Sequence, residues 1–393
     1  MDKTKTLKSQ ILEGSNAIAQ TIKNIKPAVV SAYPITPQTH IVEDLAKFKA
    51  DGEANYEYVR AESEFAAASI VEGASATGVR VYTATCSQGL LLMAEVLFNI
   101  AGMRLPVVLT CANRGVSAPI TIWNDHQDAM TVRDAGWIMF FAENTQEAVN
   151  QHIMSYKIAE QLKLPVMVNI DGFILTHSYE PVNIPNTKQI KKYLPDYKPK
   201  KGDYLDPKNP LTFGAFATPA HYMEIRQQLH NDLTASQNII NKEYKKYNKI
   251  FAPNTQHPAP STHIDNGLIE YYGPKNPKII LIAMGSVVGT IKDSVDKNKK
   301  IGILKIKTYR PFPAEDIVKI INKAKYIAVL DKAITLGHIG PLANDIKSVA
   351  QGKVKAKIQS FIVGLGGRDI TSKMIKKIIN EIKNGNDETR FIG

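Results

Sequence analysis

Tyr33-Pro34-Ile35-Thr36-Pro37 is the first of three segments that decide the fold; the others are Ser63-Glu64-Phe65-Ala66-Ala67 and Thr85-Cys86-Ser87-Gln88-Gly89. Each segment follows a short apolar run and precedes an amphipathic or alanine-rich stretch, which predicts three successive turns from strand to helix. In an open α/β sheet, ligands bind at the edge that such turns form. Because the turns carry a hydroxyl group, a carboxylate and a Ser-Gln-Gly sequence, they favour a cofactor site over a packing pattern.

Apolar strands alternate with helices throughout the chain, so we predict an α/β protein with two open, mainly parallel sheets covered by helices. The first domain is expected over residues 1–180, with a last strand at about 165–170 that closes its sheet. A linker with one long bridging helix, at about 219–250, is expected over 181–275. A second α/β domain is expected over 276–393, where a scaffold and docking role is the simplest interpretation.

Two local features of the first domain give sharper expectations. The stretch 88–103 is almost wholly apolar, which predicts a single, deeply buried helix. Thr36 or Thr39 is expected to cap the helix that runs to about residue 49. Cys86 and Cys111 lie in or beside apolar runs, which predicts buried free thiols.

Composition limits the class of protein. The net charge is +12, but the lysines are scattered or in short groups without interleaved aromatic residues, so a nucleic-acid partner is not expected. No apolar run is long enough to cross a membrane, and the polar N-terminus has no apolar signal core, so a cytoplasmic protein is expected. Two cysteines cannot supply the roughly four ligands of an iron–sulfur cluster. Any electrons handled here must leave through another chain.

Two charged residues are candidates for chemistry. Glu64 lies at the start of an alanine-rich helix, where a carboxylate can serve only to stabilise the helix by interacting with the positive end of its dipole. However, the small residues after it leave room for a flat group, and Glu62 competes for the same role. Arg114 follows the strand at about 106–111, where its guanidinium could hold a carboxylate with two parallel hydrogen bonds or form a surface ion pair.

Other polar residues have simpler interpretations. Asp125, His126 and Asp128 are crowded into four positions, which favours helix capping and loop hydrogen bonds over a metal site. Asp171-Gly172 could contact a ligand, but a turn is the preferred interpretation. No metal ligands are therefore predicted on this chain. A P-loop, a G-x-G-x-x-G and the Gly-Asp-Gly segment that binds magnesium diphosphate in thiamine enzymes are all absent.

Taken together, several segments closely resemble alpha subunits of pyruvate:ferredoxin oxidoreductases, within the 2-oxoacid:ferredoxin oxidoreductase family. They include Y-P-I-T-P-Q, A-E-S-E-F-A-A-A, T-A-T-C-S-Q-G-L-L-L-M, N-R-G-V-S-A-P, W-N-D-H-Q-D and Y-R-P-F-P. The resemblance implies a pyrimidine-type thiamine-diphosphate-binding domain followed by a transketolase-C-terminal-like domain. It also implies an enzyme that converts pyruvate and coenzyme A reversibly to acetyl-CoA and CO2, with electrons passed to ferredoxin.

The same resemblance implies roles for individual residues and subunits. Glu64 matches the glutamate that bonds the aminopyrimidine of thiamine diphosphate, and Thr36 and Arg114 match residues that contact the substrate. Pro34 and Gln88 are expected to contact the cofactor with Glu64. One departure is Phe65-Ala66, where many relatives carry His-Ser.

The missing motifs then belong to other subunits. A beta subunit with a Gly-Asp-Gly motif would share the thiamine diphosphate and hold Mg2+. Gamma and ferredoxin-like delta subunits would complete the complex, and the iron–sulfur clusters would lie on partner subunits. Three alternatives stay open. They are the same chemistry on 2-oxoisovalerate or another 2-oxoacid, a different thiamine enzyme such as a beta-type subunit of a 2-oxoacid dehydrogenase or a transketolase half, and a non-enzymatic assembly subunit.

Overall fold

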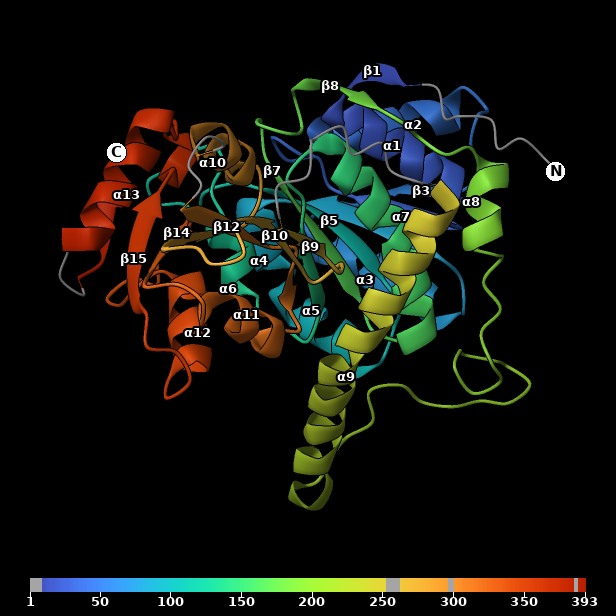
Figure 1. Cartoon of the computed structure of the whole chain (residues 1–393). Helices are drawn as coiled ribbons and strands as arrows, with labels where there is room; N and C mark the ends of the chain where they lie inside the picture. Colours follow the sequence, from blue (N-terminus) through green and yellow to red (C-terminus); the bar gives the residue numbers. More distant parts are fainter. Residues whose placement is uncertain (1–8, 252–261, 296–299, 385–387) are drawn as a thin grey trace.

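The computed structural model describes residues 9–251, 262–295, 300–384 and 388–393. Within these residues the strands form two seven-stranded sheets and one two-stranded ribbon. The predicted α/β class with two mainly parallel sheets is confirmed (Figure 1). No helix among the described residues has the length and apolar character needed to cross a membrane.

The first sheet has the strand order β13-β6-β7-β5-β4-β2-β3. Its strands are β2 (Val29–Ala32), β3 (Glu57–Arg60), β4 (Val81–Thr85), β5 (Val108–Asn113), β6 (Ile138–Phe141), β7 (Val166–Asp171) and β13 (Thr308–Arg310). All neighbouring pairs are parallel except β13 with β6. The prediction that 165–170 closes the sheet is wrong, because β7 lies between β5 and β6 and is buried along its whole length.

The second sheet has the order β16-β15-β14-β11-β12-β10-β9. Its strands are β9 (Thr262–Asp265), β10 (Ile269–Gly273), β11 (Ile279–Ala283), β12 (Ile301–Ile306), β14 (Tyr326–Asp331), β15 (Lys357–Val363) and β16 (Arg390–Ile392). Only the pairs of β10 with β12 and with β9 are antiparallel. Successive residues of β11 enter two different cores, as strand geometry requires.

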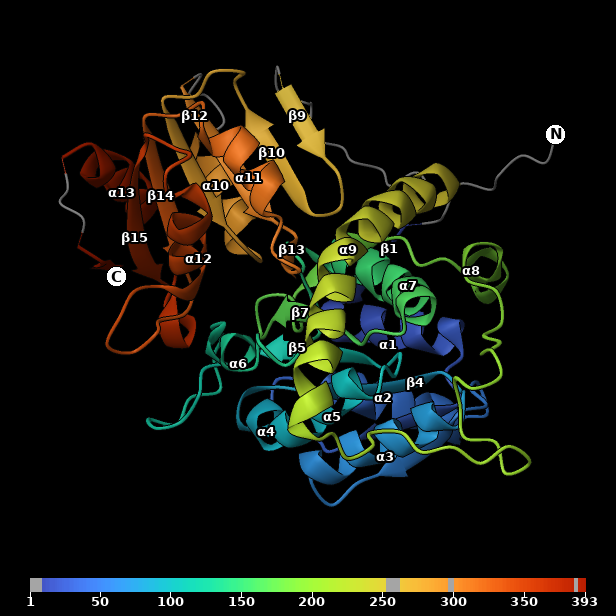
Figure 2. The ribbon, with the colours of Figure 1, turned by 90° about the horizontal axis from the view of Figure 1, so that it is seen from below.

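Helices cover both sheets. They are α1 (Gly14–Ile25), α2 (Thr39–Ala50), α3 (Glu64–Ala76), α4 (Ser87–Leu92), α5 (Ala94–Gly102), α6 (Gln127–Thr131), α7 (Thr145–Leu162), α8 (Thr187–Tyr193), α9 (Pro219–Phe251), α10 (Val287–Val295), α11 (Ala314–Ile321), α12 (Pro341–Ala350), α13 (Ser372–Asn384) and the short 3₁₀ turn η1 (Leu365–Gly367). In Figure 2, α1 and α7 lie on one side of β4, and α3 and α5 lie on the other. The ribbon of β1 (Gln10–Glu13) and β8 (Tyr179–Val182) lies outside both large sheets.

The long helix α9 contacts both halves of the chain. The Tyr247 hydroxyl donates to Asn150 Oδ1 in α7 at 2.9 Å, and Gln237 Nε2 donates to the carbonyl of Phe312 at 3.0 Å. At its other end, Tyr222 and Met223 are exposed, and this part of the helix extends beyond the sheets (Figure 1). Only the C-terminal half of α9 is therefore packed against both parts of the protein.

Two local predictions are wrong. The apolar stretch 88–103 is broken at Met93 into α4 and α5, and Leu92 and Phe98 on it are exposed. Neither Thr36 nor Thr39 caps α2, because Gln38 occupies the capping position and no side chain bonds there. The Gln38 side chain instead binds the turn itself, accepting from the Ile35 amide and donating to the carbonyl of Ala84.

A candidate cofactor site at the edge of the first sheet

Four adjacent strands of the first sheet end at the predicted site. Thr36 follows β2, Glu64 follows β3, Gln88 follows β4 and Arg114 follows β5. Because these strands are parallel and lie in the order β5-β4-β2-β3, their carboxyl ends share one edge of the sheet. The structure therefore brings the predicted residues to the same edge. Pro34 is also there, exposed in the loop after β2.

Glu64 is a buried carboxylate. It opens α3, whose cap is Ser63: the Ala66 amide donates to Ser63 Oγ at 3.1 Å. Only 7% of Glu64 is exposed, yet its carboxylate forms no hydrogen bond or ion pair with any described residue. The competing Glu62 is exposed. Since a buried charge without a partner is costly, Glu64 is the better candidate for a ligand contact.

Gly89 makes room for this carboxylate. A Cβ atom at position 89 would lie 2.6 Å from Glu64 Oε1 and 2.5 Å from Thr85 Oγ1. Any other residue would therefore displace Glu64 or the Thr85 hydroxyl, which is itself buried and has no hydrogen-bond partner among the described residues. The glycine of the Ser-Gln-Gly turn is required by this close approach.

Arg114 is a buried cation. It is 7% exposed, and its guanidinium donates to two backbone carbonyls, those of Thr121 at 2.5 Å and Thr36 at 2.9 Å. It forms no ion pair with any carboxylate in the described parts of the chain. The surface ion pair considered for Arg114 is therefore excluded for those parts. A buried guanidinium that is bonded to carbonyl groups but to no described carboxylate is suited to bind an anionic ligand.

Asp128 ties two of the turns together. Its Oδ2 accepts hydrogen bonds from the amides of Ser87 at 2.8 Å and Arg114 at 2.9 Å, and its Oδ1 accepts from Asn113 Nδ2 at 3.0 Å. Ser87 has a φ of 50°, an uncommon conformation that these contacts maintain. Loop hydrogen bonding by Asp128 is confirmed, whereas α6 begins without a side-chain cap.

The remaining residues of this edge differ in accessibility. Thr36 is exposed, and its carbonyl also accepts a bond from Cys86 Sγ at 3.2 Å. Gln88 is half-buried and its side chain bonds the hydroxyls of Ser87 and Ser117. Burial, and then the nearby Asp128 carboxylate, raise the pKa of Cys86 to about 12. The prediction of buried free thiols is confirmed for both cysteines.

Asp171 is not the simple turn residue that was preferred from sequence. It is fully buried and bonds His126 Nε2 at 2.7 Å, Lys332 Nζ at 2.8 Å and the Ser286 amide at 3.0 Å. Burial alone would raise the pKa of Asp171, but the Lys332 ammonium and His126 hold it well below its usual range. We call these four residues the Asp171 cluster. It joins the first sheet to loops of the second.

The loop that carries Arg114 rests on the same loops of the second sheet. The His126 amide donates to the carbonyl of Lys332 at 2.7 Å, and the Gly367 amide donates to that of Asn124 at 2.6 Å. Asp125 Oδ2 accepts from the Gly366 amide at 3.1 Å. Sequence reasoning missed these contacts, because the partner residues lie more than 200 positions away. Loops of the second sheet therefore hold the loop that carries Arg114.

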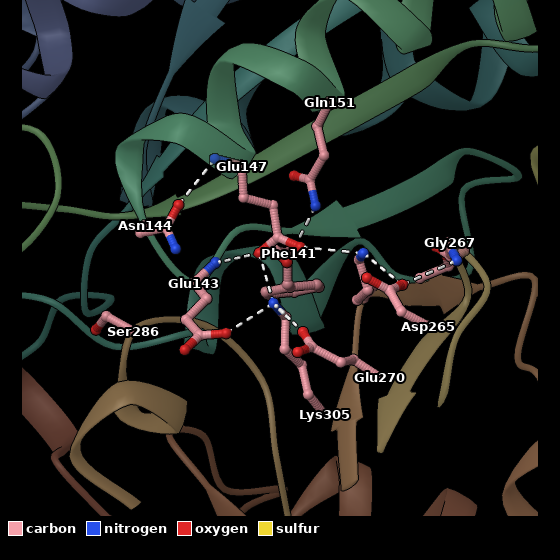
Figure 3. A network of polar contacts seen from close by, with 12 residues as sticks. Phe141, Glu143, Asn144, Glu147, Gln151, Asp265, Gly267, Glu270, Ser286 and Lys305 are labelled. Carbon is pink, nitrogen blue, oxygen red and sulfur yellow. Dashed lines mark hydrogen bonds and ion pairs between the residues drawn. The ribbon is translucent and has the colours of Figure 1, made fainter. Parts of the chain in front are cut away.

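A second polar region joins the two sheets at another place, shown in Figure 3. Lys305 bonds Glu143 at 2.7 Å, Glu147 at 2.9 Å and Glu270 at 3.0 Å. Lys307 bonds Asp265 at 2.8 Å and Glu147 at 3.5 Å, and Lys292 bonds Glu143 and Glu270. We call this set the Lys305 network. It lines a cavity of about 430 Å³.

Comparisons with known proteins agree with this architecture. Residues 20–245 match the family model described as pyruvate flavodoxin/ferredoxin oxidoreductase, thiamine diphosphate-binding, and 277–375 match pyruvate:ferredoxin oxidoreductase core domain II. A solved 2-oxoglutarate:ferredoxin oxidoreductase from Magnetococcus marinus is similar in fold, with a TM-score of 0.69 and 19% identity. That similarity covers 95% of this chain and 65% of the solved chain.

Curated relatives match over nearly the full length. Pyruvate synthase subunit PorA of Methanocaldococcus jannaschii is 45% identical over 392 residues, which is 98% of this chain and 97% of the relative. PorA of Methanosarcina barkeri is 46% identical over 96% and 93% of the two chains. Ketoisovalerate oxidoreductase subunit VorA of Pyrococcus horikoshii is 38% identical over 95% and 93%. This chain therefore belongs to the pyruvate flavodoxin/ferredoxin oxidoreductase family and contains its thiamine diphosphate-binding domain.

Proposed function

We propose that this chain is the alpha subunit of a cytoplasmic complex that oxidises pyruvate and coenzyme A to acetyl-CoA and CO2, reversibly, and passes the electrons to ferredoxin. One observation carries the proposal: Glu64 and Arg114 are buried and oppositely charged at one edge of the sheet, and neither has an ionic partner among the described residues. Family membership removes the alternative of a 2-oxoacid dehydrogenase beta subunit.

The residues of this edge fit the cofactor. Glu64 offers a buried carboxylate that no described residue pairs with, and Gly89 leaves the space that a side chain would fill. In the proposal, Glu64 shares a proton with the pyrimidine ring nitrogen, and Pro34 and Gln88 line the same side. Thiamine diphosphate, when bound, supplies the nucleophilic carbon and the electron sink. This chain orients the ring and keeps water away from it.

Arg114 and Thr36 bind the 2-oxoacid in this proposal. The Arg114 guanidinium holds the carboxylate until CO2 leaves, because two carbonyls already fix its orientation. The Thr36 hydroxyl is exposed in the adjacent turn and can donate to the same substrate. Both residues sit in loops that other contacts hold in place, which favours a preorganised site.

The other parts of the complex are proposed on the same basis. A beta subunit with a Gly-Asp-Gly motif would hold the diphosphate and Mg2+, since this sequence lacks that motif. Gamma and ferredoxin-like delta subunits would complete the complex, and the iron–sulfur clusters would lie on partner subunits, since this chain has two cysteines. The division at 1–180, 181–275 and 276–393 stays a prediction.

The decisive experiment measures dye or ferredoxin reduction by the reconstituted complex with Glu64→Gln. Turnover should fall by roughly 10²–10⁴-fold, the usual contribution of a positioned acid–base group. Glu62→Gln is the matched control, because that carboxylate is exposed two positions away, and it should keep parental turnover. Near-normal turnover of Glu64→Gln would reject the proposed role and leave the assembly-subunit alternative.

The substrate is tested by comparing kcat/KM for pyruvate and 2-oxoisovalerate in the same complex. The matches to PorA subunits at 42–46% identity, against 37–38% for VorA subunits, favour pyruvate. Arg114→Ala should raise KM for either 2-oxoacid, since both carry the carboxylate. Unchanged kinetics would remove Arg114 from the substrate site.

A further inference from the structure

We propose that Glu13, His40 and His177 form a binding site for a divalent transition-metal ion of the Zn2+ class. The three residues lie far apart in the sequence: Glu13 ends β1, His40 is in the first turn of α2, and His177 lies in the loop between β7 and β8. One ligand atom of each lies within 4.8 Å of those of the other two. The role of Glu64 and Arg114 does not enter this inference.

Backbone contacts hold Glu13 and His177 close together. Glu13 is paired with Tyr179 in the β1–β8 ribbon. The next two residues continue the contact: the Gly14 amide donates to the carbonyl of Ser178 at 3.1 Å, and the Ser15 amide donates to that of Thr176 at 2.9 Å. The approach is so close that a Cβ at Gly14 would lie 1.8 Å from the carbonyl oxygen of Leu175. The β1–β8 ribbon and the turn beside it therefore hold two of the three ligands close together.

The two imidazole rings are also oriented by their neighbours. His177 Nδ1 lies 2.7 Å from Thr176 Oγ1, so its Nε2 is the nitrogen left for an ion. Phe173 packs against the His177 ring with centroids 4.6 Å apart, and the His40 ring lies 4.5 Å away on centroids. In metal sites the second ring nitrogen of a ligating histidine is usually hydrogen-bonded, and Thr176 Oγ1 is placed to accept from it here.

The donor set selects the class of ion. Two imidazoles and one carboxylate suit Zn2+, Co2+ or Ni2+, whereas Mg2+ and Ca2+ prefer oxygen ligands. His40 Nδ1 and Glu13 Oε1 are 2.6 Å apart, which is a hydrogen-bond distance with one proton between the two atoms. Ligands on one tetrahedral ion lie about 3.3 Å apart at bond lengths of about 2.0–2.2 Å. The ion would replace that proton after small side-chain rotations, which the exposed His40 and half-buried Glu13 and His177 permit.

The site would fasten three segments to one another. His40 is four residues after Thr36, so an ion held by His40 and His177 would tie the start of α2 to the loop after β7. Three protein ligands leave at least one coordination position for water. Without an ion, the three residues are linked to one another only by the His40–Glu13 contact and the contact of the two imidazole rings. Contacts between exposed charged side chains contribute little free energy.

The test uses the full chain freed of metal with a chelator. Zn2+ binding is measured by isothermal titration calorimetry, and Co2+ binding by its visible absorption. One equivalent of Zn2+ should bind. His177→Ala and Glu13→Gln should each lower the Zn2+ affinity by about 10–100-fold or more, because loss of even an outer-shell partner of a metal ligand has an effect of that size. The control is His338→Ala, because His338 is exposed and its side chain contacts Asn344. Zn2+ should raise the Tm of the parent and of this control alone.

Several results would overturn the proposal. Equal Zn2+ affinity of the parent and both site variants would assign binding to others of the nine histidines. Binding of Mg2+ in preference to Zn2+ would contradict the ion class. Should His177→Ala fail to fold, Glu13→Gln decides alone, because it keeps the size of the side chain and its bond to His40. Circular dichroism of the metal-free variants separates loss of fold from loss of ligand.

Discussion

This protein contains two kinds of buried charged residues, those without an ionic partner among the described residues and those with one. Glu64 and Arg114, at the edge of the first sheet, have no ionic partner in the described chain. By contrast, Asp171 has Lys332, and Lys305 has three carboxylates. Unpaired buried charges cost stability and are retained where a ligand completes them, whereas paired charges join the two sheets. The presence of a partner therefore separates residues for binding from residues for architecture.

The paired regions also differ from each other. In the Asp171 cluster, Lys332 forms an ion pair with one carboxylate, that of Asp171, and both residues are almost fully buried. In the Lys305 network, each lysine has more than one carboxylate, and Glu143 and Glu270 each contact two lysines. Removing one member should therefore be severe in the cluster and mild in the network.

The largest expected effect on stability belongs to Asp171→Ala. The change leaves the Lys332 ammonium buried without its carboxylate, which costs about 3–5 kcal/mol. The free energy of unfolding of the full chain, measured in urea, should fall by that amount. Asp134→Ala is the control, since Asp134 is 73% exposed and its ion pairs are 3.7 and 4.0 Å long. A loss below about 1 kcal/mol for Asp171→Ala would equate the cluster with a surface ion pair.

Glu64→Gln should act in the opposite direction on the isolated chain. Removing a buried charge without a partner should stabilise the fold by about 0.5–2 kcal/mol, even as activity of the complex is lost. Urea unfolding of the free chain measures this change, with Glu62→Gln expected within about 0.5 kcal/mol of the parent. Destabilisation by Glu64→Gln would mean that Glu64 has a structural partner, and the contrast drawn above would disappear.

Glu270→Gln should have the smallest effect, about 1 kcal/mol or less at neutral pH, because Lys305 keeps Glu143 and Glu147. Burial would raise the pKa of Glu270, but Lys305 and Lys292 hold it below the ordinary value of 4.5. A lowered carboxyl pKa stabilises the folded state above the unfolded value, and this contribution is lost as pH falls through the folded value. The parent should therefore lose more stability than the variant as pH drops below about 4.5.

Urea midpoints across that acid range provide the measurement. The two proteins should converge as the pH falls, because the variant has no carboxyl group at position 270 to protonate. Parallel curves would show that Glu270 contributes nothing to acid sensitivity, and the network would then act through Glu143 and Glu147 alone.

Much of the fold could be predicted because its signals are local. Each central strand is an apolar run, and each turn after it carries polar residues, so the two parallel sheets and the edge with Glu64 and Arg114 follow from neighbouring positions. The antiparallel additions β9 and β10 could not be predicted in the same way. They are short or alternate in burial, and lie in a stretch rich in proline and asparagine.

Long-range partners escaped prediction for a different reason. Nothing near Asp171 marks Lys332 as its partner, because the two are 161 positions apart and only the packed fold unites them. The prediction of one deeply buried helix over 88–103 was wrong because the stretch is apolar on all sides, which does not reveal which side chains are covered. Leu92 is 51% and Phe98 43% exposed. An apolar sequence does not show whether residues of the same chain or of another subunit bury its side chains.

The strand β13 has a consequence for how the protein is made. Residues 308–310 pair with Met139 and Phe140, so the last strand of the first sheet is synthesised more than 160 residues after its neighbour. Until the ribosome has released that segment, β6 presents an unprotected edge to other nascent chains. Dividing the gene between the two sheets would make that exposure permanent, so the N-terminal half expressed alone should self-associate.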